Sequence, residues 1–315
     1  YKLHITISIG IAFYPDNGIN ARNLLRKADI AMYKAKELGK NSIQYFNNDM
    51  MKEICFRNDI KKDLRAAVEN EELLLCYQPI IDINTKKMLS LEALLRWKHP
   101  KKGLISPMEF IPIAEETKLI IPIGEWVLQA ACKQLMEWHQ MGYIDCGVAI
   151  NISVIQLQQY DFVEVINKVL KKTGMMPQYL ELEITESAFI DSIHNVAANI
   201  DCLKKQGIKI SIDDFATGYC SLKYLQKFSI NGLKIDRNFI CNIEFDINKA
   251  IIDTVISLGH RMNMKITAEG VETQQQYDYL KEKGCDKIQG YYFSKPFLPE
   301  EATDVLREIN DNNTI

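Results

Sequence analysis

Eight strand-like segments alternate with helix-like segments from residue 73 to about residue 306, and this order restricts the possible folds more than any other feature of the chain. The strand-like segments are short and rich in branched apolar residues. They read LLLCYQPII, MLSLEALLRW, CGVAINIS, YLELEIT, IKISID, GLKID, MKITAEG and KIQGYYF. Eight such units in about 240 residues predict an α/β chain folded as a (β/α)8 TIM-like barrel, with a doubly wound sheet as the structural alternative.

The composition indicates a soluble globular protein. The chain has 315 residues, 47% of them hydrophobic, and a net charge of -3. No apolar run approaches the roughly 20 residues that span a bilayer, so we expect a cytoplasmic chain without membrane contact. The sequence starts without Met and without a signal pattern, which is typical of a fragment boundary, and an anchor in a preceding region stays possible.

Two classes of site are disfavoured by the charged residues and cysteines. The chain has no block of Lys and Arg, so we expect no binding to duplex nucleic acid. The eight cysteines form no Cys-x-x-Cys pair and lie at no short spacing from a histidine, which argues against zinc.

Polar residues recur at or near the ends of the predicted strands. Because catalytic groups of such barrels gather where the strands end, we expect these side chains to meet at one mouth. The residues are Gln78, Glu92, Asn151, Glu183, Glu186, Asp213, Asp214, Lys234, Asp236, Glu269, Glu272 and Gln289.

Each of these residues also has an ordinary structural interpretation. A lone acidic residue at a strand end is usually a helix N-cap, Asn151 has the character of a turn former and Lys234 that of a surface charge. Five carboxylates at one mouth, however, need protons or cations to balance their charge. Such an oxygen-rich set suits Mg²⁺ or Mn²⁺.

The adjacent pair Asp213 and Asp214 raises a geometric question, since neighbouring side chains of a strand point to opposite faces. We predict that Asp213 ends its strand and that an immediate turn brings Asp214 back to the same mouth. Two such carboxylates suit two cations about 3.5 to 4 Å apart, the usual arrangement for hydrolysing a phosphodiester. An Asx-type turn is the alternative for Asp214.

Residues 1–47 read as a strand, a helix and a strand, which is too little for an independent domain. Their sequences ITISIGIAFYP and LLRKADIAMYKAKELGKNSIQYF resemble the C-terminal end of a GGDEF domain, the diguanylate cyclase family. The signature hairpin of that family is absent, so the fragment is not expected to be a cyclase. We expect a connector helix at 48–56, a second domain at 57–308 and a tail at 309–315.

A second set of motifs resembles the EAL domain, a family of cyclic di-GMP phosphodiesterases and degenerate relatives. They are LEALLRW at 91–97, NIS at 151–153, ELEITES at 181–187, IDDFATGYCSLKYL at 212–225, LKIDRNFI at 233–240, AEGVET at 268–273 and QGYYFSKPF at 289–297. So many linked motifs in order make an accidental match improbable.

The EAL resemblance implies a role for each residue. The implied metal ligands are Glu92, Asn151, Glu183, Asp213 and Asp214. Glu269 would be the general base, and Lys234 the ammonium that orients the attacking water. Substrate or supporting contacts are implied at Gln78, Arg96, Asp236 and Gln289. Glu186 would hold the loop after the fifth strand, and Glu272 would be a second supporting carboxylate. The resemblance also implies two Mg²⁺ or Mn²⁺ ions and a homodimer. Ca²⁺ is expected to bind and inhibit, because its looser coordination positions the water poorly.

Three residues depart from the usual EAL pattern. Ala216 and Cys220 stand where most active members have Gly and Ser, and Lys118 replaces a common Gly. If position 216 has a positive φ, Ala costs about 1 kcal/mol relative to Gly and slows the reaction rather than abolishing it.

The resemblance therefore implies a metal-dependent phosphodiesterase that opens cyclic di-GMP to linear pGpG in bacterial second-messenger signalling. The alternative is a weak or inactive EAL domain that acts as a cyclic di-GMP receptor. A barrel glycosidase is a third reading, but it leaves Asn151 and Lys234 unexplained.

Overall fold

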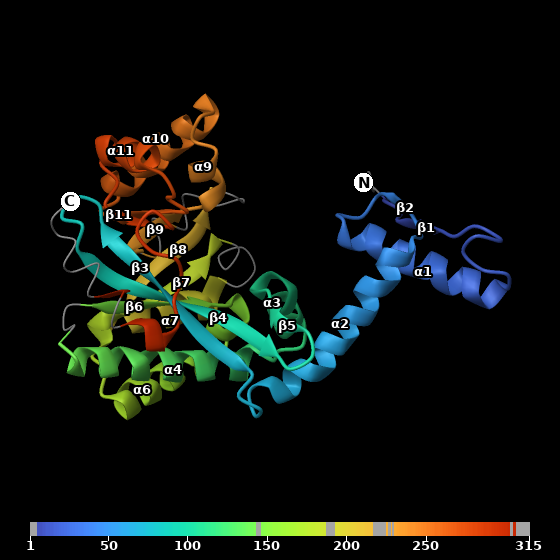
Figure 1. Cartoon of the computed structure of the whole chain (residues 1–315), viewed down its shortest axis with the longest axis horizontal. Helices are drawn as coiled ribbons and strands as arrows, with labels where there is room; N and C mark the ends of the chain where they lie inside the picture. Colours follow the sequence, from blue (N-terminus) through green and yellow to red (C-terminus); the bar gives the residue numbers. More distant parts are fainter. Residues whose placement is uncertain are drawn as a thin grey trace. The chain divides into compact units, whose positions relative to one another are not determined.

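The computed structural model describes residues 5–142, 146–186, 193–216, 225, 228, 230–302 and 305–306. The chain divides into two compact units, residues 1–66 and 67–315 (Figure 1). The predicted tail at 309–315 and Cys220 lie outside the described residues.

The first unit is a small parallel sheet packed on one helix. Strand β1 (Ile9–Ile11) pairs with β2 (Ile43–Tyr45), and α1 (Ala21–Glu37) connects them. Gly10 lies so close to α1 that an added Cβ would be 2.0 Å from the carbonyl oxygen of Ala28. This contact explains why a residue without a side chain stands in the middle of β1.

Helix α2 (Asn48–Ala67) follows β2 as one continuous helix. Its ion pairs with α1 join Glu53 to Lys34 at 2.5 Å and Arg57 to Glu37 at 2.8 Å. The connector predicted at 48–56 is therefore only the first half of a longer helix, because the helical pattern continues without a Gly or Pro to end it.

The second unit is a closed barrel, as the strand pattern predicts. Its strands are β3 (Leu73–Asp82), β4 (Met88–His99), β6 (Gly147–Ile152), β7 (Leu180–Thr185), β8 (Lys209–Phe215), β9 (Gly232–Ile235), β10 (Lys265–Glu269) and β11 (Lys287–Gln289). They pair in the order β3-β11-β10-β9-β8-β7-β6-β4, and β3 pairs again with β4 to close the ring. A short strand, β5 (Gly103–Ile105), extends the sheet beside β4.

Strand β3 runs antiparallel to both of its neighbours, which corrects the expected placement of Gln78. Gln78 lies in the middle of β3, opposite Glu92 of β4, rather than at a strand end. The short link between β3 and β4 could have predicted this antiparallel pairing. Only five residues lie between Asp82 and Met88, whereas a parallel connection needs a dozen residues or more.

Helices cover the outside of the barrel strands (Figure 1). They are α3 (Pro107–Glu116), α4 (Ile120–Gln140), α5 (Val154–Leu157), α6 (Phe162–Thr173), α7 (Ile193–Lys205), α9 (Arg237–Cys241), α10 (Asp246–Arg261) and α11 (Gln274–Glu282), with 3-10 turns η1 (Pro177–Tyr179) and η3 (Pro299–Glu301). Among the described residues, no helix combines the length and apolar character that crossing a bilayer requires.

The apolar core lies between the strands and these helices. Leu180, Leu182 and Ile184 alternate along β7 and are buried, while the residues between them point into the barrel. Tyr77 of β3 packs edge-on against Trp138 of α4, with ring centroids 4.7 Å apart. The outward face of each strand therefore builds the core and leaves the inward face free for polar residues.

Asp286 joins the beginnings of β10 and β11. It accepts hydrogen bonds from Lys265 Nζ at 2.6 Å and from the backbone N–H of Ile266 at 3.0 Å, and its carboxylate lies 2.9 Å from His260 Nε2. Burial alone would raise the pKa of Asp286, but the bonds from Lys265 and Ile266 hold it below its usual range.

We expect Asp286→Asn to lower the free energy of unfolding by about 1 to 3 kcal/mol at neutral pH. A depressed pKa adds stability above the unfolded value of about 3.9, and this stability is lost as the pH falls through the lower folded value. Urea unfolding of both proteins from pH 7 downward checks this, and the gap should close in acid. A gap that is independent of pH would show that the charge contributes nothing.

Candidate functional site

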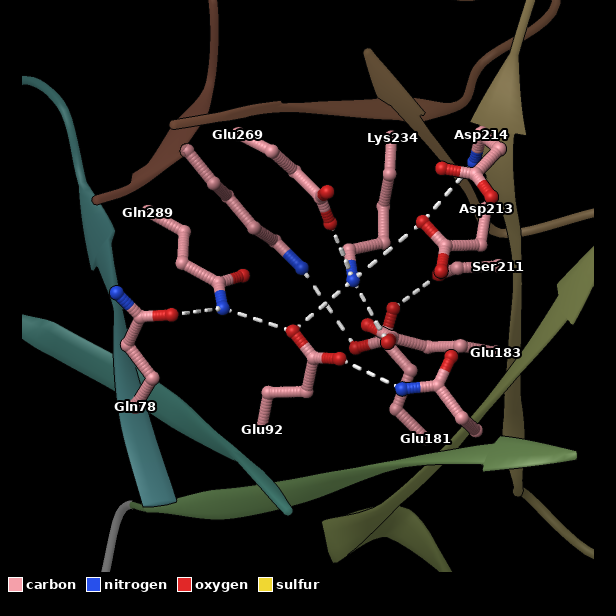
Figure 2. A network of polar contacts seen from close by, with 12 residues as sticks. Gln78, Glu92, Glu181, Glu183, Ser211, Asp213, Asp214, Lys234, Glu269 and Gln289 are labelled. Atoms are coloured by element: carbon pink, nitrogen blue, oxygen red, sulfur yellow. Dashed lines mark hydrogen bonds and ion pairs between the residues drawn. The ribbon is translucent and has the colours of Figure 1, made fainter. Parts of the chain in front are cut away.

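Carboxylates from four strands converge on the ammonium of Lys234, at one end of the barrel interior (Figure 2). Lys234 Nζ lies 2.5 Å from Glu269 Oε1, 2.7 Å from Glu183 Oε2, 3.2 Å from Glu92 Oε2 and 3.6 Å from Asp213 Oδ1. The Lys234 side chain is only 3% exposed. The surface-charge interpretation of Lys234 is therefore wrong, and the predicted meeting of these residues is found.

Glu92 lies at the centre of a chain of amide contacts. Its carboxylate accepts hydrogen bonds from Asn151 Nδ2 at 2.6 Å and from Gln289 Nε2 at 2.7 Å. Gln289 Nε2 also contacts Gln78 Oε1 at 3.0 Å, and Gln78 donates to the backbone oxygen of Ser294 at 3.1 Å. Gln78 thus reaches the site from the middle of the antiparallel strand β3.

A β-bulge, rather than a turn after the strand, places both Asp213 and Asp214. Strand β8 continues to Phe215, and its pairing with β9 shifts by one residue between Ile212 and Phe215. Asp214 has a φ of +53°, the left-handed region that Asp tolerates better than most residues. The extra residue turns two adjacent carboxylates toward the same space.

Burial changes the proton affinity of the acidic residues. It raises the pKa of Glu269 to about 8, with the charges of Asp213 and Glu92 adding to the effect of burial and Lys234 opposing it. Burial and then Glu92 raise the pKa of Glu183 well above its usual range. Burial and the neighbouring Asp213 raise the pKa of Asp214 to about 6. If all of these carboxyls were ionised, the cluster would carry more negative charge than Lys234 alone balances, so each of the three binds a proton more readily than usual.

For Lys234 and Glu92, neighbouring charges and hydrogen bonds outweigh the effect of burial on the pKa. Burial alone would lower the pKa of Lys234, but Asp213, Glu183 and the other carboxylates hold it well above its usual range. Burial alone would raise the pKa of Glu92, but Lys234 and the Gln289 hydrogen bond hold it below its usual range. These two residues form a charged pair at the bottom of the site.

Three of the carboxylates fit a divalent cation. Asp213, Asp214 and Glu269 each place one oxygen so that all three oxygens lie within 4.8 Å of one another. Hard cations such as Mg²⁺ and Mn²⁺ prefer oxygen ligands of this kind. The raised pKa values of Asp214 and Glu269 indicate a site that gains from added positive charge.

Two cavities adjoin the acidic cluster. One, of about 220 Å³, is lined by Arg96, Arg237, Tyr291 and other residues. The other, of about 300 Å³, is mainly apolar and runs from Asp213 and Asp214 toward α3 and α4. The acidic cluster is therefore bordered by one cavity with arginine side chains in its wall and one that is mainly apolar.

The remaining predicted residues lie around this centre. Asp236 caps α9 by accepting the N–H of Asn238 at 2.9 Å, and its carboxyl also interacts with that of Asp214. Glu272 pairs with Arg237 at 2.9 Å. Glu186 is buried, and its two carboxylate oxygens have no partner within the described ranges. Thr217, its expected partner, lies outside them.

Arg237 and Tyr291 lie at the site although the sequence motifs did not predict them there. Both line the smaller cavity, and the Arg237 guanidinium lies 6.0 Å from the centre of the Tyr291 ring. Gly270 makes room for Arg237, since an added Cβ would lie 2.2 Å from its Cγ. The available signals were the position of Arg237 directly after Asp236 and the Gly in the AEGVET motif.

Ala216 and Lys118, which stand where EAL domains commonly have glycine, both have a left-handed backbone conformation. Ala216 has a φ of +73° and Lys118 a φ of +61°. The positive φ on which the predicted cost of Ala216 depends is therefore present.

We expect Ala216→Gly to raise the free energy of unfolding by up to about 1 kcal/mol and to match or raise turnover. Ala250→Gly, at an exposed helical position of α10, should instead destabilise by about 1 kcal/mol. Equal effects of the two substitutions in urea unfolding would contradict the strain at Ala216.

Comparison with known proteins places this geometry in a family. The family "EAL domain" matches residues 61–296, and the family "Diguanylate cyclase, GGDEF domain" matches residues 1–42. The chain is 42% identical to "Signaling protein YkoW" of Bacillus subtilis, over 98% of this chain and 38% of that protein. It is 40% identical to "Bifunctional diguanylate cyclase/cyclic di-GMP phosphodiesterase MucR" of Pseudomonas aeruginosa, over 96% of this chain and 44% of that protein.

A solved structure agrees with the family assignment. The structure "PaMucR Phosphodiesterase, c-di-GMP complex" is 40% identical, with a TM-score of 0.74 over 77% of this chain and 99% of that one. The chain spans about two fifths of the length of the two curated relatives. It belongs to the EAL domain family, and a fragment of a GGDEF domain precedes the EAL domain at residues 1–42.

Proposed function

We propose that this chain is a metal-dependent phosphodiesterase that hydrolyses cyclic di-GMP to linear pGpG. The observation that carries the proposal is the set of four carboxylates around Lys234, with Asp213, Asp214 and Glu269 close enough to hold a cation. The relative MucR, named as a cyclic di-GMP phosphodiesterase, and the cyclic di-GMP complex described above support the choice of substrate.

The metal residues would be Glu92, Asn151, Glu183, Asp213 and Asp214, holding Mg²⁺ or Mn²⁺. Glu269 lies in the same group of oxygens as Asp213 and Asp214, and it would act on the water beside the cation. When bound, such cations lower the pKa of water and offset the charge that develops on the phosphate. Glu92, Glu183 and Asp213 are already brought together by Lys234, and Asn151 by Glu92. These contacts hold four of the five proposed ligands close together, and a cation would compete with the Lys234 ammonium for the carboxylate oxygens.

Glu269 is the residue that would take the proton from the attacking water. A base works best when its pKa lies near the working pH, and burial raises the pKa of Glu269 to about 8. Its 2.5 Å contact with Lys234 orients the carboxylate and keeps a positive charge beside the reacting groups. Arg96, in the wall of the smaller cavity, supplies a planar donor for a phosphate oxygen.

The test is hydrolysis of cyclic di-GMP by the full chain, followed by chromatographic separation of pGpG. We expect product with Mg²⁺ or Mn²⁺ and none with EDTA or with Ca²⁺, whose looser coordination positions water poorly. Product formed equally well in EDTA would refute the metal dependence. Tight binding of cyclic di-GMP without product under all conditions would make the chain a receptor instead.

We further infer a cytoplasmic homodimer with the EAL domain at residues 57–308, preceded by the GGDEF fragment at 1–47 and by the first half of α2 at 48–56 as the connector. The family resemblance is the support for the dimer. Sedimentation at several protein concentrations tests it, and a monomer at all concentrations would rule it out.

A further inference from the structure

A second layer of polar side chains lies inside the barrel, next to the acidic cluster. Glu181 precedes Glu183 by two residues on β7, Ser211 precedes Asp213 by two residues on β8, and Lys287 stands in the same relation to Gln289 on β11. Residues i and i+2 of a strand share a face, so this layer lies about 6 to 7 Å from the site layer. Barrel interiors are usually filled by Val, Ile and Leu, so charged residues here require an explanation.

Glu181, Ser211 and Lys287 contact one another, and we call these three residues the interior bridge. The Ser211 hydroxyl donates a hydrogen bond to Glu181 Oε1, and Lys287 Nζ lies 3.7 Å from Glu181 Oε2. Figure 2 shows Glu181 and Ser211 beside Glu183 and Asp213. Three strands separate β7 from β11 in the sheet, so the ion pair crosses the interior of the barrel.

The surrounding layer leaves space for this bridge. A Cβ added to Gly232 of β9 would lie 2.9 Å from the Ser211 hydroxyl oxygen, so a larger residue would displace the hydroxyl. The side chains of Lys287 and Glu181 are 17% and 12% exposed, so neither charge is fully hydrated. A buried charge that loses its partner must find another one.

The acidic cluster is the obvious alternative partner for Lys287. Within the described part of the chain, Glu92, Glu183, Asp213 and Glu269 share the one ammonium of Lys234 in the site layer. The Lys287 ammonium sits one layer away on a long and flexible stem. Without Glu181, the cluster would attract this second ammonium. An ammonium among the carboxylates competes with a divalent cation for the same oxygens.

We propose that the interior bridge is a positioning device which holds Lys287 away from the acidic cluster and so keeps the carboxylates available to a cation. Glu181 acts through Lys287 and Ser211 and is not itself a metal ligand. The proposal rests on the metal site of the proposed function and adds residues that control its affinity.

The test is calorimetric titration of the full chain, freed of metal, with Mn²⁺ alone. Glu181→Gln should weaken Mn²⁺ binding by about tenfold or more, the usual size of such indirect effects. Lys287→Met should bind Mn²⁺ at least as tightly as the wild type, because a nearby positive charge is removed. The double variant Glu181→Gln with Lys287→Met should return most of the lost affinity.

Glu181→Gln and Lys287→Met break the same ion pair, so a general loss of structure would change the Mn²⁺ affinity in the same direction in both. Opposite changes in affinity therefore distinguish the positioning role from such a loss. Glu137→Gln is the matched control, because Glu137 forms an exposed pair with Lys133 at 3.8 Å on α4, and it should leave binding unchanged. Unchanged affinity in Glu181→Gln, weakened affinity in Lys287→Met, or a double variant as weak as Glu181→Gln would each overturn the interior bridge while leaving the phosphodiesterase proposal intact. A wild-type chain that binds no Mn²⁺ would overturn both.

Discussion

Replacing Glu92 by Ala is expected to abolish hydrolysis of cyclic di-GMP together with metal binding. The Glu92 carboxylate contacts Lys234, Asn151 and Gln289, and all three lose their shared partner in the variant. Breaking a buried pair costs about 3 to 5 kcal/mol. If the same loss falls on the transition state, turnover decreases by about 10² to 10³-fold or more.

Turnover and Mn²⁺ titration of the Glu92→Ala protein check this result, with circular dichroism to confirm the fold. Asp213→Ala should behave in the same way, because Asp213 belongs both to the Lys234 cluster and to the candidate cation site. Glu92→Gln keeps the shape of the side chain, so the same measurements can be made on it if the alanine variant fails to fold. Near-normal turnover in either folded variant would disprove the two-metal assignment.

Replacing Glu269 by Gln should separate chemistry from binding. Removing a general base typically costs about 10² to 10⁴-fold in rate, while a Gln of the same shape keeps the cavity intact. We therefore expect a large decrease in kcat with little change in KM. Steady-state kinetics at saturating Mg²⁺ measure both quantities.

The pH profile gives a second test of Glu269. A base must lose its proton to act, so with a pKa raised to about 8 the wild-type rate should rise with pH through the neutral range. A bound cation shifts this rise to lower pH, and the Glu269→Gln protein should lack it. Unchanged turnover in the variant would move the base role elsewhere, with Glu272 as the next candidate. Glu272 pairs with Arg237 and is 38% exposed, so Glu272→Gln should have the smaller effect.

Much of the barrel could be predicted from the sequence because the signals for it are local. Alternating apolar residues such as Leu180, Leu182 and Ile184 define a strand face within a few residues, and the eight predicted strands are confirmed. The direction of β3 was missed although its signal was also local. The short link between Asp82 and Met88 allows a hairpin and excludes a parallel crossover.

The placement of Asp213 and Asp214 could be predicted only in part from the sequence. The sequence indicates that two adjacent carboxylates need an irregular backbone to face one mouth, and this part of the prediction holds. The form of the irregularity depends on β9, because a bulge is defined by the pairing of two strands and not by one strand alone. For this reason the predicted terminal turn is replaced by a bulge within β8.

The sequence by itself determined which residues lie on the inner faces of the strands, since a period of two residues is a property of the local backbone. Only the tertiary structure decided which of them meet. Lys234 lies 142 positions after Glu92, and Glu181 lies 106 positions before Lys287, yet each pair is in contact. Such contacts exist only when the sheet closes, because closure brings strands that are distant in the chain to opposite walls of one narrow interior.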